Sequence, residues 1–361
     1  MTDSILLDCT AFHPSCSTGG VSVYKQEVIP ALQDHFRFTA FYKHIDVSAL
    51  DACGPIISQR EQVKGNMLVW RDRAVRRLAK MGAKGVWFPT QFSAWLPALP
   101  SLVTIHDMAA FLSRSSFGPL AKAYMPATLF ASSISARKLL VVSEASANDM
   151  NRLFPWTKKR TVVARHGLPS DVRKRAEQIG ISRHRTEGKI SMIFLDGANM
   201  RKRLDLSLLA LDKLGWKNIE LKITGNAESV EKRVLSVLGH VPGAIKFVGR
   251  LDRSILLDTL AESDLLLYPS NFEGFGFPLI EAMSFGTSVV CLPGNAEKEA
   301  GGEFAIYATR PDADTLLQSI HSAMERARDK SWQQSLMQHA LSFTWDDSIA
   351  IHRQELENLI T

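Results

Sequence analysis

The sequence has few cysteines and no long apolar run, and these two features limit the classes of protein to which the chain can belong. Four cysteines occur, Cys9, Cys16, Cys53 and Cys291, and none stands in a CxxC pair or in the Cys/His spacing of a zinc site. No apolar segment reaches the roughly 18–20 residues that span a bilayer. Residues 1–10 have no basic leader followed by an apolar run of about 7–15 residues. We therefore expect a cytoplasmic chain with reduced thiols.

Charge is distributed unevenly along the chain. The formal net charge is +6 at pH 7, but residues 1–170 hold 20 Lys and Arg against 11 Asp and Glu, whereas the remaining residues hold 23 against 26. A basic half beside a mildly acidic half suggests that one domain meets an anionic surface or substrate, and chance drift in surface charge is the plainer alternative. No nucleic-acid-binding motif accompanies the charge, so we expect no nucleic-acid partner.

Short apolar runs rich in β-branched residues alternate with longer amphipathic stretches, a pattern typical of βαβ units with buried parallel strands. Strands are expected at residues 5–8, 36–42, 85–88, 102–106, 139–142, 162–165, 190–195, 219–224, 245–248, 265–268, 288–292 and 305–307. Helices are expected at residues 20–32, 120–136, 204–214, 231–238, 253–262, 278–285 and 313–326. A chain of 361 residues is too long for one hydrophobic core. The expected fold class is therefore α/β, with two Rossmann-like, doubly wound domains that face each other across a ligand-binding cleft.

The boundary between the two domains is expected in a polar, charged stretch without strand or core signals. Residues 1–170 form the N-terminal domain, residues 171–188 the linker and residues 189–343 the C-terminal domain. Residues 344–361 carry apolar positions at helical spacing, which predicts a closing helix that packs back on the N-terminal domain.

One segment combines features of a phosphate site and a sugar site. Residues 264–293 read DLLLYPSNFEGFGFPLIEAMSFGTSVVCLP, which predicts a buried strand, a glycine-containing loop and a helix opened by Pro278. Loop glycines let a ligand approach the backbone, and free N–H groups at a helix N-terminus favour a phosphate. Glu273 on the loop and Glu281 in the first helical turn can each accept two hydroxyl hydrogen bonds, from a sugar or a ribose. The alternative is a turn before a helix with two solvated glutamates.

Residues 270–290, SNFEGFGFPLIEAMSFGTSVV, resemble the E-x7-E motif of retaining glycosyltransferases of family 4, which have the two-domain GT-B fold. The resemblance implies that Glu273 contacts hydroxyl groups of the transferred sugar and that Glu281 contacts the ribose. It also implies that Gly274, Phe275 and Gly276 supply backbone donors near the diphosphate and the sugar. The N-terminal domain then takes the acceptor, and the C-terminal domain takes the nucleotide-sugar.

A basic segment follows the first expected strand of the second domain. Gly197 opens it, and Arg201 and Lys202 match a basic pair that the family carries at this place, where it neutralises the leaving diphosphate. Arg203 stands where the family commonly has glycine, and the arginine that many members place directly after the strand is absent. An exposed, cationic helix start is the alternative.

Weaker resemblances lie elsewhere in the chain. Gly20, in STGGV at residues 17–21, matches a glycine-rich loop that touches donor phosphates, although an ordinary βα turn explains it as well. His106, in LVTIHDMAAF at residues 102–111, matches a family histidine that touches the donor sugar or the acceptor, and a neutral structural histidine is the alternative. Gly225 and Asn226 match a turn near the nucleotide, with an architectural role as the competing interpretation.

The resemblance implies transfer of a hexose with retention of configuration, with Glu273, Lys202, Arg201 and His106 as the catalytic group. GDP-mannose is the favoured donor, and the acceptor is a lipid-linked or polysaccharide intermediate of bacterial cell-surface polysaccharide or lipopolysaccharide (O-antigen) synthesis. No D-x-D pair occurs where a metal-bound diphosphate is expected, so we expect neither a metal nor another cofactor. Residues 70–84 (WRDRAVRRLAKMGAK) predict a basic amphipathic helix, which suits peripheral contact with the anionic inner face of the cell membrane or a merely solvated exterior.

Other functions stay open at this stage. A nucleotide-sugar epimerase or hydrolase could use the same donor site without an acceptor, and a catalytically idle member of the family could serve as a binding scaffold. A phosphorylase-like enzyme needs a Schiff-base lysine for pyridoxal phosphate, which we cannot identify. An NAD-dependent dehydrogenase needs a GxGxxG sequence after a strand, and the sequence has none.

Overall fold

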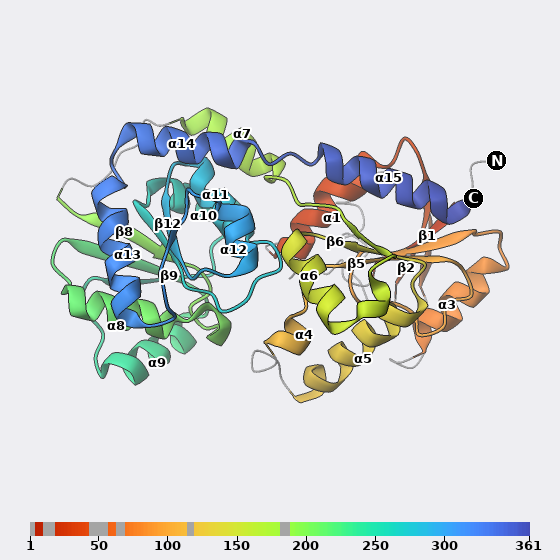
Figure 1. Cartoon of the computed structure of the whole chain (residues 1–361), viewed down its shortest axis with the longest axis horizontal. Coiled ribbons are helices and arrows are strands. Elements are labelled where there is room, and N and C mark those ends of the chain that lie inside the picture. Colours follow the sequence, from red (N-terminus) through yellow and green to blue (C-terminus); the bar gives the residue numbers. More distant parts are fainter. Residues whose placement is uncertain (1–3, 10–18, 43–56, 63–68, 114–118, 181–187) are drawn as a thin grey trace. The chain divides into compact units, whose positions relative to one another are not determined.

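The computed structural model describes residues 4–9, 19–42, 57–62, 69–113, 119–180 and 188–361. The chain forms two compact units, Met1–Gly167 with Thr344–Thr361, and Leu168–Phe343. Each unit contains a parallel β-sheet with helices on its faces (Figure 1). The predicted α/β fold with two Rossmann-like domains is confirmed.

The sheet of the first unit has the strand order β3-β2-β1-β4-β5-β6-β7, and all its neighbouring strands are parallel. Its strands are β1 (Ser4–Asp8), β2 (Arg37–Tyr42), β3 (Ile57–Gln62), β4 (Gly85–Phe88), β5 (Ser101–Ile105), β6 (Lys138–Val141) and β7 (Thr161–Val163). Its helices are α1 (Gly20–Ala31), α3 (Trp70–Ala79), α4 (Ala109–Leu112), α5 (Pro119–Ser135), α6 (Glu144–Leu153), the 3-10 helix η3 (Pro155–Thr157) and α15 (Asp346–Ile360). The expected strands of this half are all present, and β3, a polar strand at the sheet edge, is additional.

The sheet of the second unit has the order β10-β9-β8-β11-β12-β13 and is also parallel. Its strands are β8 (Ile190–Phe194), β9 (Ile219–Thr224), β10 (Ile245–Gly249), β11 (Leu265–Tyr268), β12 (Ser288–Cys291) and β13 (Ile306–Tyr307). Its helices are α7 (Ser170–Ile179), the 3-10 helix η4 (Met200–Lys202), α8 (Leu204–Leu214), α9 (Ala227–Leu238), α10 (Arg253–Glu262), α11 (Phe277–Ser284), α12 (Asn295–Gly301), α13 (Ala313–Arg326) and α14 (Lys330–Leu341).

Two helical layers cover the second sheet (Figure 1). Helices α8, α9 and α13 pack together, and their apolar side chains join those of the strands in one buried cluster. Helices α7, α10, α12 and α14 each contact α11. Because both faces are covered, strands β8, β11 and β12 read as largely apolar runs, whereas β9 (IELKIT) alternates between apolar and polar residues.

The prediction of a linker at residues 171–188 is wrong for residues 171–179. Ser170–Ile179 forms helix α7, which buries Val172 and Ala176. Arg175 on this helix forms an ion pair with Asp258 of α10 at 2.5 Å. Two apolar residues one helical turn apart suffice to seat a short helix on a packed neighbour, even in a highly charged segment. The rest of the predicted linker, residues 181–187, lies outside the described residues.

Helix α3 turns its apolar side into the first unit. Trp70, Val75 and Leu78 are 3%, 0% and 2% exposed, and Arg71 is buried in an ion pair with Asp8 at 2.7 Å. An interfacial helix needs a free apolar face that can enter the headgroup region. The protein core therefore occupies most of the apolar face of this helix, and peripheral membrane contact of residues 70–84 through their exposed cations stays a prediction. Within the described residues, no helix is both long and apolar enough to cross a bilayer.

Helix α15 returns to the first unit, where it contacts α1, β4 and β5. Gly85 makes room for it, since a Cβ at this position would lie 2.8 Å from Leu359 Cδ2. His352 on α15 shares a hydrogen bond of 2.6 Å with the Tyr24 hydroxyl, which in turn lies 2.9 Å from Thr104 Oγ1. These buried contacts hold the C-terminal helix against the sheet.

Candidate functional site

The strand order of the second sheet reverses at one point, between β8 and β11. From β8 the chain adds β9 and β10 on one side of the sheet, and then β11, β12 and β13 on the other. β8 pairs with β9 on one side and with β11 on the other. Ligands of such sheets bind at the carboxyl ends of the strands beside such a point, so the loops that leave β8 and β11 form the candidate site. The loop after β8 leads into η4, and the loop after β11, residues 269–276, leads into α11.

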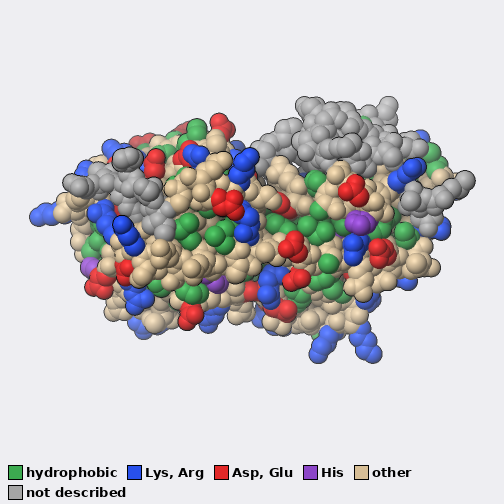
Figure 2. Space-filling model, turned by 90° about the horizontal axis from the view of Figure 1, so that it is seen from above, with side chains coloured by type: hydrophobic (Ala, Val, Ile, Leu, Met, Phe, Trp, Pro, Cys, Tyr) green, Lys and Arg blue, Asp and Glu red, His purple; other side chains and the backbone are tan. Residues whose placement is uncertain are grey.

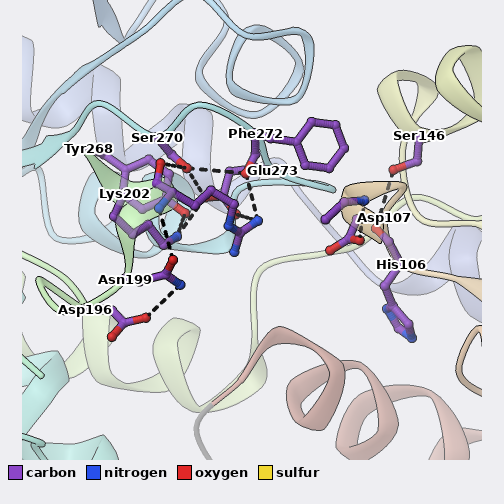
Figure 3. Close-up of polar contacts among 12 residues, drawn as sticks. His106, Asp107, Ser146, Asp196, Asn199, Lys202, Tyr268, Ser270, Phe272 and Glu273 are labelled. Atoms are coloured by element: carbon purple, nitrogen blue, oxygen red, sulfur yellow. Dashed lines mark hydrogen bonds and ion pairs between the residues drawn. The ribbon is translucent and has the colours of Figure 1, made fainter. Parts of the chain in front are cut away.

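Lys202 and Glu273 meet at this point (Figure 3). Lys202 Nζ donates to Glu273 Oε1 at 2.7 Å and to the Tyr268 hydroxyl at 2.6 Å. Ser270 Oγ donates to the same Glu273 oxygen at 2.5 Å. Only 11% of the Lys202 side chain and 10% of the Glu273 side chain are exposed. Lys202 and Glu273, which two separate sequence motifs predict, thus form one nearly buried ion pair.

Arg201 lies beside the same carboxylate. Its Nη1 is 3.5 Å from Glu273 Oε2 and donates to the carbonyl oxygen of Phe272 at 2.7 Å. Asn199 Oδ1 caps η4 by accepting a hydrogen bond from the Arg201 N–H at 3.1 Å, and the Arg201 carbonyl accepts one from the Asn271 N–H at 2.9 Å. The two loops are therefore tied together, and both cations are held in place.

The charge of Glu273 follows from a balance between burial and its neighbours. Burial by itself raises the pKa of a carboxyl group, but the charges of Lys202 and Arg201 more than offset it and hold the pKa of Glu273 below its ordinary value. Glu273 is therefore ionised at neutral pH. An ionised carboxylate accepts hydrogen bonds from hydroxyl groups on both oxygens.

A second carboxyl group, Glu297, shares this electrostatic field. It lies in the first turn of α12 and is 1% exposed, and its Oε1 has no hydrogen-bond partner in the described part of the chain. Burial raises the pKa of Glu297, the charge of Glu273 raises it further, and the result is a pKa of about 7. Glu297 therefore changes its charge near neutral pH, whereas Glu273 does not.

Glu281 lies further along α11 than the sequence predicts. The helix begins at Phe277 with Gly276 as its N-cap, so Glu281 follows the first turn instead of standing in it. Its side chain is buried, and one oxygen accepts a hydrogen bond from Arg253 Nη2 at 2.8 Å. Arg253 also binds Asp171 through Nε at 2.8 Å. A protein cation thus occupies one oxygen of Glu281, and its contact with a ribose stays a prediction.

Backbone conformation and side-chain packing explain why the predicted glycine loop contains glycine and an aromatic residue. Gly276 has a φ of +103°, which favours glycine, and Gly274 is partly buried in the same loop. Phe275 is 3% exposed, and its ring packs edge-on against Phe277 with centroids 5.3 Å apart. Contact of the backbone of Gly274, Phe275 and Gly276 with a ligand stays a prediction.

The turns after β8 and β9 are equally tight. A Cβ on Gly197 would lie 2.5 Å from Ile223 Cγ2, and Gly225 has a φ of +124°. Asn226 caps α9, because its side chain accepts a hydrogen bond from the Ser229 N–H at 3.0 Å. These features explain the residue types by architecture, and a role in donor binding stays a prediction for all three.

His106 is built into the interior of the first unit. It is 7% exposed, its Nε2 shares a hydrogen bond of 2.9 Å with the Pro89 carbonyl, and its ring packs edge-on against Tyr24. Burial is the main cause that lowers the pKa of His106 to about 4, so the ring is neutral at pH 7. The geometry favours the structural alternative, and contact with substrate stays a prediction. Gly20 is the first residue of α1, and residues 17–18 of its loop lie outside the described residues.

Sequence reasoning missed several side chains that complete the site in the second unit. Tyr268 and Ser270 lie at the carboxyl end of β11, so their position after a buried strand could have identified them. Arg253 and Glu297 belong to no motif and carry no such signal. In the described part of the chain, no group of three or more His, Cys, Asp or Glu side chains is arranged to hold a metal ion, and the predicted independence from metal stays a prediction.

This region is similar in sequence to a known protein family. Residues 176–334 match the family described as glycosyl transferases group 1. The O-antigen chain mannosyltransferase B of Escherichia coli is 26% identical over 260 residues, which cover 68% of this chain and 67% of that protein.

Solved structures extend the likeness to the whole fold. A glycosyltransferase from Rickettsia africae ESF-5 aligns with a TM-score of 0.71 at 15% identity, over 100% of this chain and 99% of that chain. HepE of Anabaena, in complex with UDP and glucose, aligns with a TM-score of 0.70 at 16% identity, over 99% of this chain and 100% of that chain. The second unit is therefore similar in sequence to the group 1 glycosyl transferases, and the chain as a whole has the GT-B fold of glycosyltransferases.

Proposed function

We propose that this chain is a retaining, metal-independent glycosyltransferase of family 4 that moves a hexose from a nucleotide-sugar to a lipid-linked or polysaccharide acceptor. The observation that carries the proposal is the ion pair of Lys202 and Glu273 at the switch point of the second sheet. An ionised carboxylate suits the hydroxyl groups of the transferred sugar, and the adjacent cations suit its diphosphate. The likeness to an O-antigen mannosyltransferase supports GDP-mannose as the donor and cell-surface polysaccharide or lipopolysaccharide synthesis as the setting.

In the proposed reaction the acceptor hydroxyl oxygen forms a bond to the anomeric carbon on the face from which the diphosphate oxygen leaves. The bond between that carbon and the diphosphate breaks, and the leaving diphosphate takes the acceptor's proton. Lys202 and Arg201 stabilise the charge that develops on the leaving group, an effect worth about 3–4 kcal/mol per donor in other enzymes. Glu273 holds the sugar hydroxyl groups, and its ion pair with Lys202 fixes it in position.

The test is release of nucleoside diphosphate from a panel of GDP- and UDP-hexoses, with EDTA present and with or without a membrane-lipid extract as acceptor source. We expect turnover that depends on the extract and falls about 100- to 1,000-fold in Lys202→Met and in Glu273→Gln. The matched control is Lys232→Met with Glu228→Gln, an ion pair of the same unit whose side chains are 72% and 75% exposed. Those control variants should keep wild-type turnover.

Each other outcome points to one of the alternatives. Turnover without an acceptor indicates a nucleotide-sugar epimerase or hydrolase, and loss of turnover in EDTA overturns metal independence. Donor binding without any turnover indicates a binding scaffold. Product anomers identified by NMR decide between retention and inversion, and the inverted anomer would refute assignment to family 4.

A further inference from the structure

Three exposed apolar side chains adjoin one another on α5 and η3 of the first unit. Phe130, Ile134 and Trp156 are 47%, 58% and 51% exposed. Phe130 and Ile134 are one helical turn apart on α5, and the ring centroids of Phe130 and Trp156 are 6.3 Å apart. We call these three residues the α5 patch. Single exposed apolar residues are normal on a protein surface, whereas adjoining ones mark a contact site.

The α5 patch is firmly supported from beneath. Phe154 is buried, and its ring lies 5.4 Å from that of Trp156 and 6.3 Å from that of Phe130. Arg160, just after η3, donates hydrogen bonds to the carbonyl oxygens of Ser133 at 2.6 Å and Ala136 at 2.5 Å. Because these carbonyls belong to the last turn of α5 and its end, Arg160 fastens the segment of Trp156 to the helix that carries Phe130. The exposed rings are therefore held ready and need no rearrangement to meet a partner.

The chain segment that carries the α5 patch is basic. Residues 108–170 contain nine Lys and Arg against two Asp and Glu. The two acidic residues, Glu144 and Asp149, each already pair with an arginine. Lys158 and Lys159 are exposed and follow η3 directly. On the face seen in Figure 2, by contrast, Lys and Arg side chains are interspersed with Asp and Glu.

We propose that the α5 patch, with Lys158 and Lys159, docks the first unit on an anionic lipid surface. Tryptophan and phenylalanine favour the boundary between headgroups and acyl chains, and flanking lysines reach anionic headgroups with their extended side chains. The excess of positive charge selects anionic over zwitterionic lipid and makes the attraction sensitive to salt. This surface differs from α3, whose apolar face lies in the core, and the proposal does not depend on which sugar is transferred.

The experiment is flotation of the full chain with vesicles of phosphatidylcholine alone or mixed with phosphatidylglycerol, at low and high salt. We expect binding to the mixed vesicles, weakened by salt, and little binding to phosphatidylcholine. Trp156→Ser with Ile134→Ser should weaken binding at least tenfold, and so should Lys158→Glu with Lys159→Glu. Ile255→Ser, which alters an equally exposed apolar residue of the second unit, should leave binding unchanged.

The second control tests the rival surface on α3. Arg73→Glu with Arg76→Glu changes two exposed cations of that helix, and should leave binding nearly intact. The proposal is overturned if the wild type fails to bind anionic vesicles, if both α5 patch variants bind as the wild type does, or if the α3 variant alone loses binding. Thermal unfolding confirms that each variant is folded. Hydrolysis or transfer of nucleotide-sugar in solution, without vesicles, is measured separately, so that failure of the proposed reaction is distinguished from failure of membrane docking.

Discussion

Replacing Glu297 by glutamine should change the stability of the second unit in a way that depends on pH. The pKa of Glu297 rises from 4.5 to about 7 on folding, and the side chain is 1% exposed. An acid with a raised pKa binds more protons in the folded state, so its contribution is neutral below pH 4.5, becomes steadily more destabilising between pH 4.5 and 7, and is constant above that range. At about 1.4 kcal/mol for each tenfold change in proton affinity, the full penalty is about 3 kcal/mol.

Glutamine has nearly the same shape but never ionises, so Glu297→Gln should escape this penalty. We expect the difference in free energy of unfolding between variant and wild type to shift by about 2 kcal/mol in favour of the variant between pH 5.5 and 8.5. Urea unfolding at several pH values, followed by circular dichroism, measures it, and comparing both proteins at each pH cancels the titration of all other groups. A difference that stays constant across this range would refute the assignment of a raised pKa to Glu297.

Two further perturbations follow from the same kind of reasoning. Burial lowers the pKa of His106, His166 and His352, so the folded first unit resists protonation that the unfolded chain accepts near pH 6.5. Its free energy of unfolding should be highest above pH 6.5 and decline toward pH 4. Urea unfolding at several pH values between 7.5 and 5 measures this free energy. A value that does not change with pH would contradict the prediction. Gly197→Ala should destabilise the second unit by about 1–3 kcal/mol through overpacking, because its Cβ would lie 2.5 Å from a side chain of β9. Gly243→Ala, where a Cβ meets nothing within 4 Å, is the control and should cost less, as thermal unfolding of both variants can decide.

The sequence was a good guide to the sheets because buried parallel strands leave a clear signature. All the expected strands are present, and most of them are apolar on both faces because helices cover both sides of the sheets. β3 was not predicted because its sequence, ISQREQ, lacks an apolar run. Helix α7 was not predicted because only two of its residues, Val172 and Ala176, are apolar and buried, and most of the rest of the segment is charged or polar.

Periodicity predicts that a helix has an apolar side but does not identify what covers it. Residues 70–84 have the composition of an interfacial helix, yet Trp70 and Leu78 pack in the protein core. Nothing local distinguishes the two cases, because a protein core and a lipid interface both favour the same side chains. The exposed Trp156 lies in a 3-10 helix, where no periodic pattern exists to draw attention to it.

The pairing of Lys202 with Glu273 was only half predictable. Each residue belongs to a motif, but their contact joins positions 71 apart in sequence, and only the strand order brings the loops after β8 and β11 together. The burial of Glu297 had no signal at all, because its segment also contains Glu299 and Glu303, and the choice among them depends on which side of α12 faces the protein.

The first sheet suggests how such sites could be found without a motif. It too changes direction at one point, between β1 and β4, and Asp8 at the carboxyl end of β1 forms a buried ion pair with Arg71. A charge that directly follows a buried apolar strand cannot reach solvent easily, so it requires an opposite charge from another segment of the chain. Asp8 stands in the sequence as the first charge after an apolar strand, and Lys202 and Glu273 lie in the loops that follow two others. Searching for a charge at these positions, and then for its partner after the neighbouring strand, would therefore have indicated the pair of Lys202 and Glu273. It would not have indicated Arg71, which lies on α3 after β3, two strands away from β1 in the sheet.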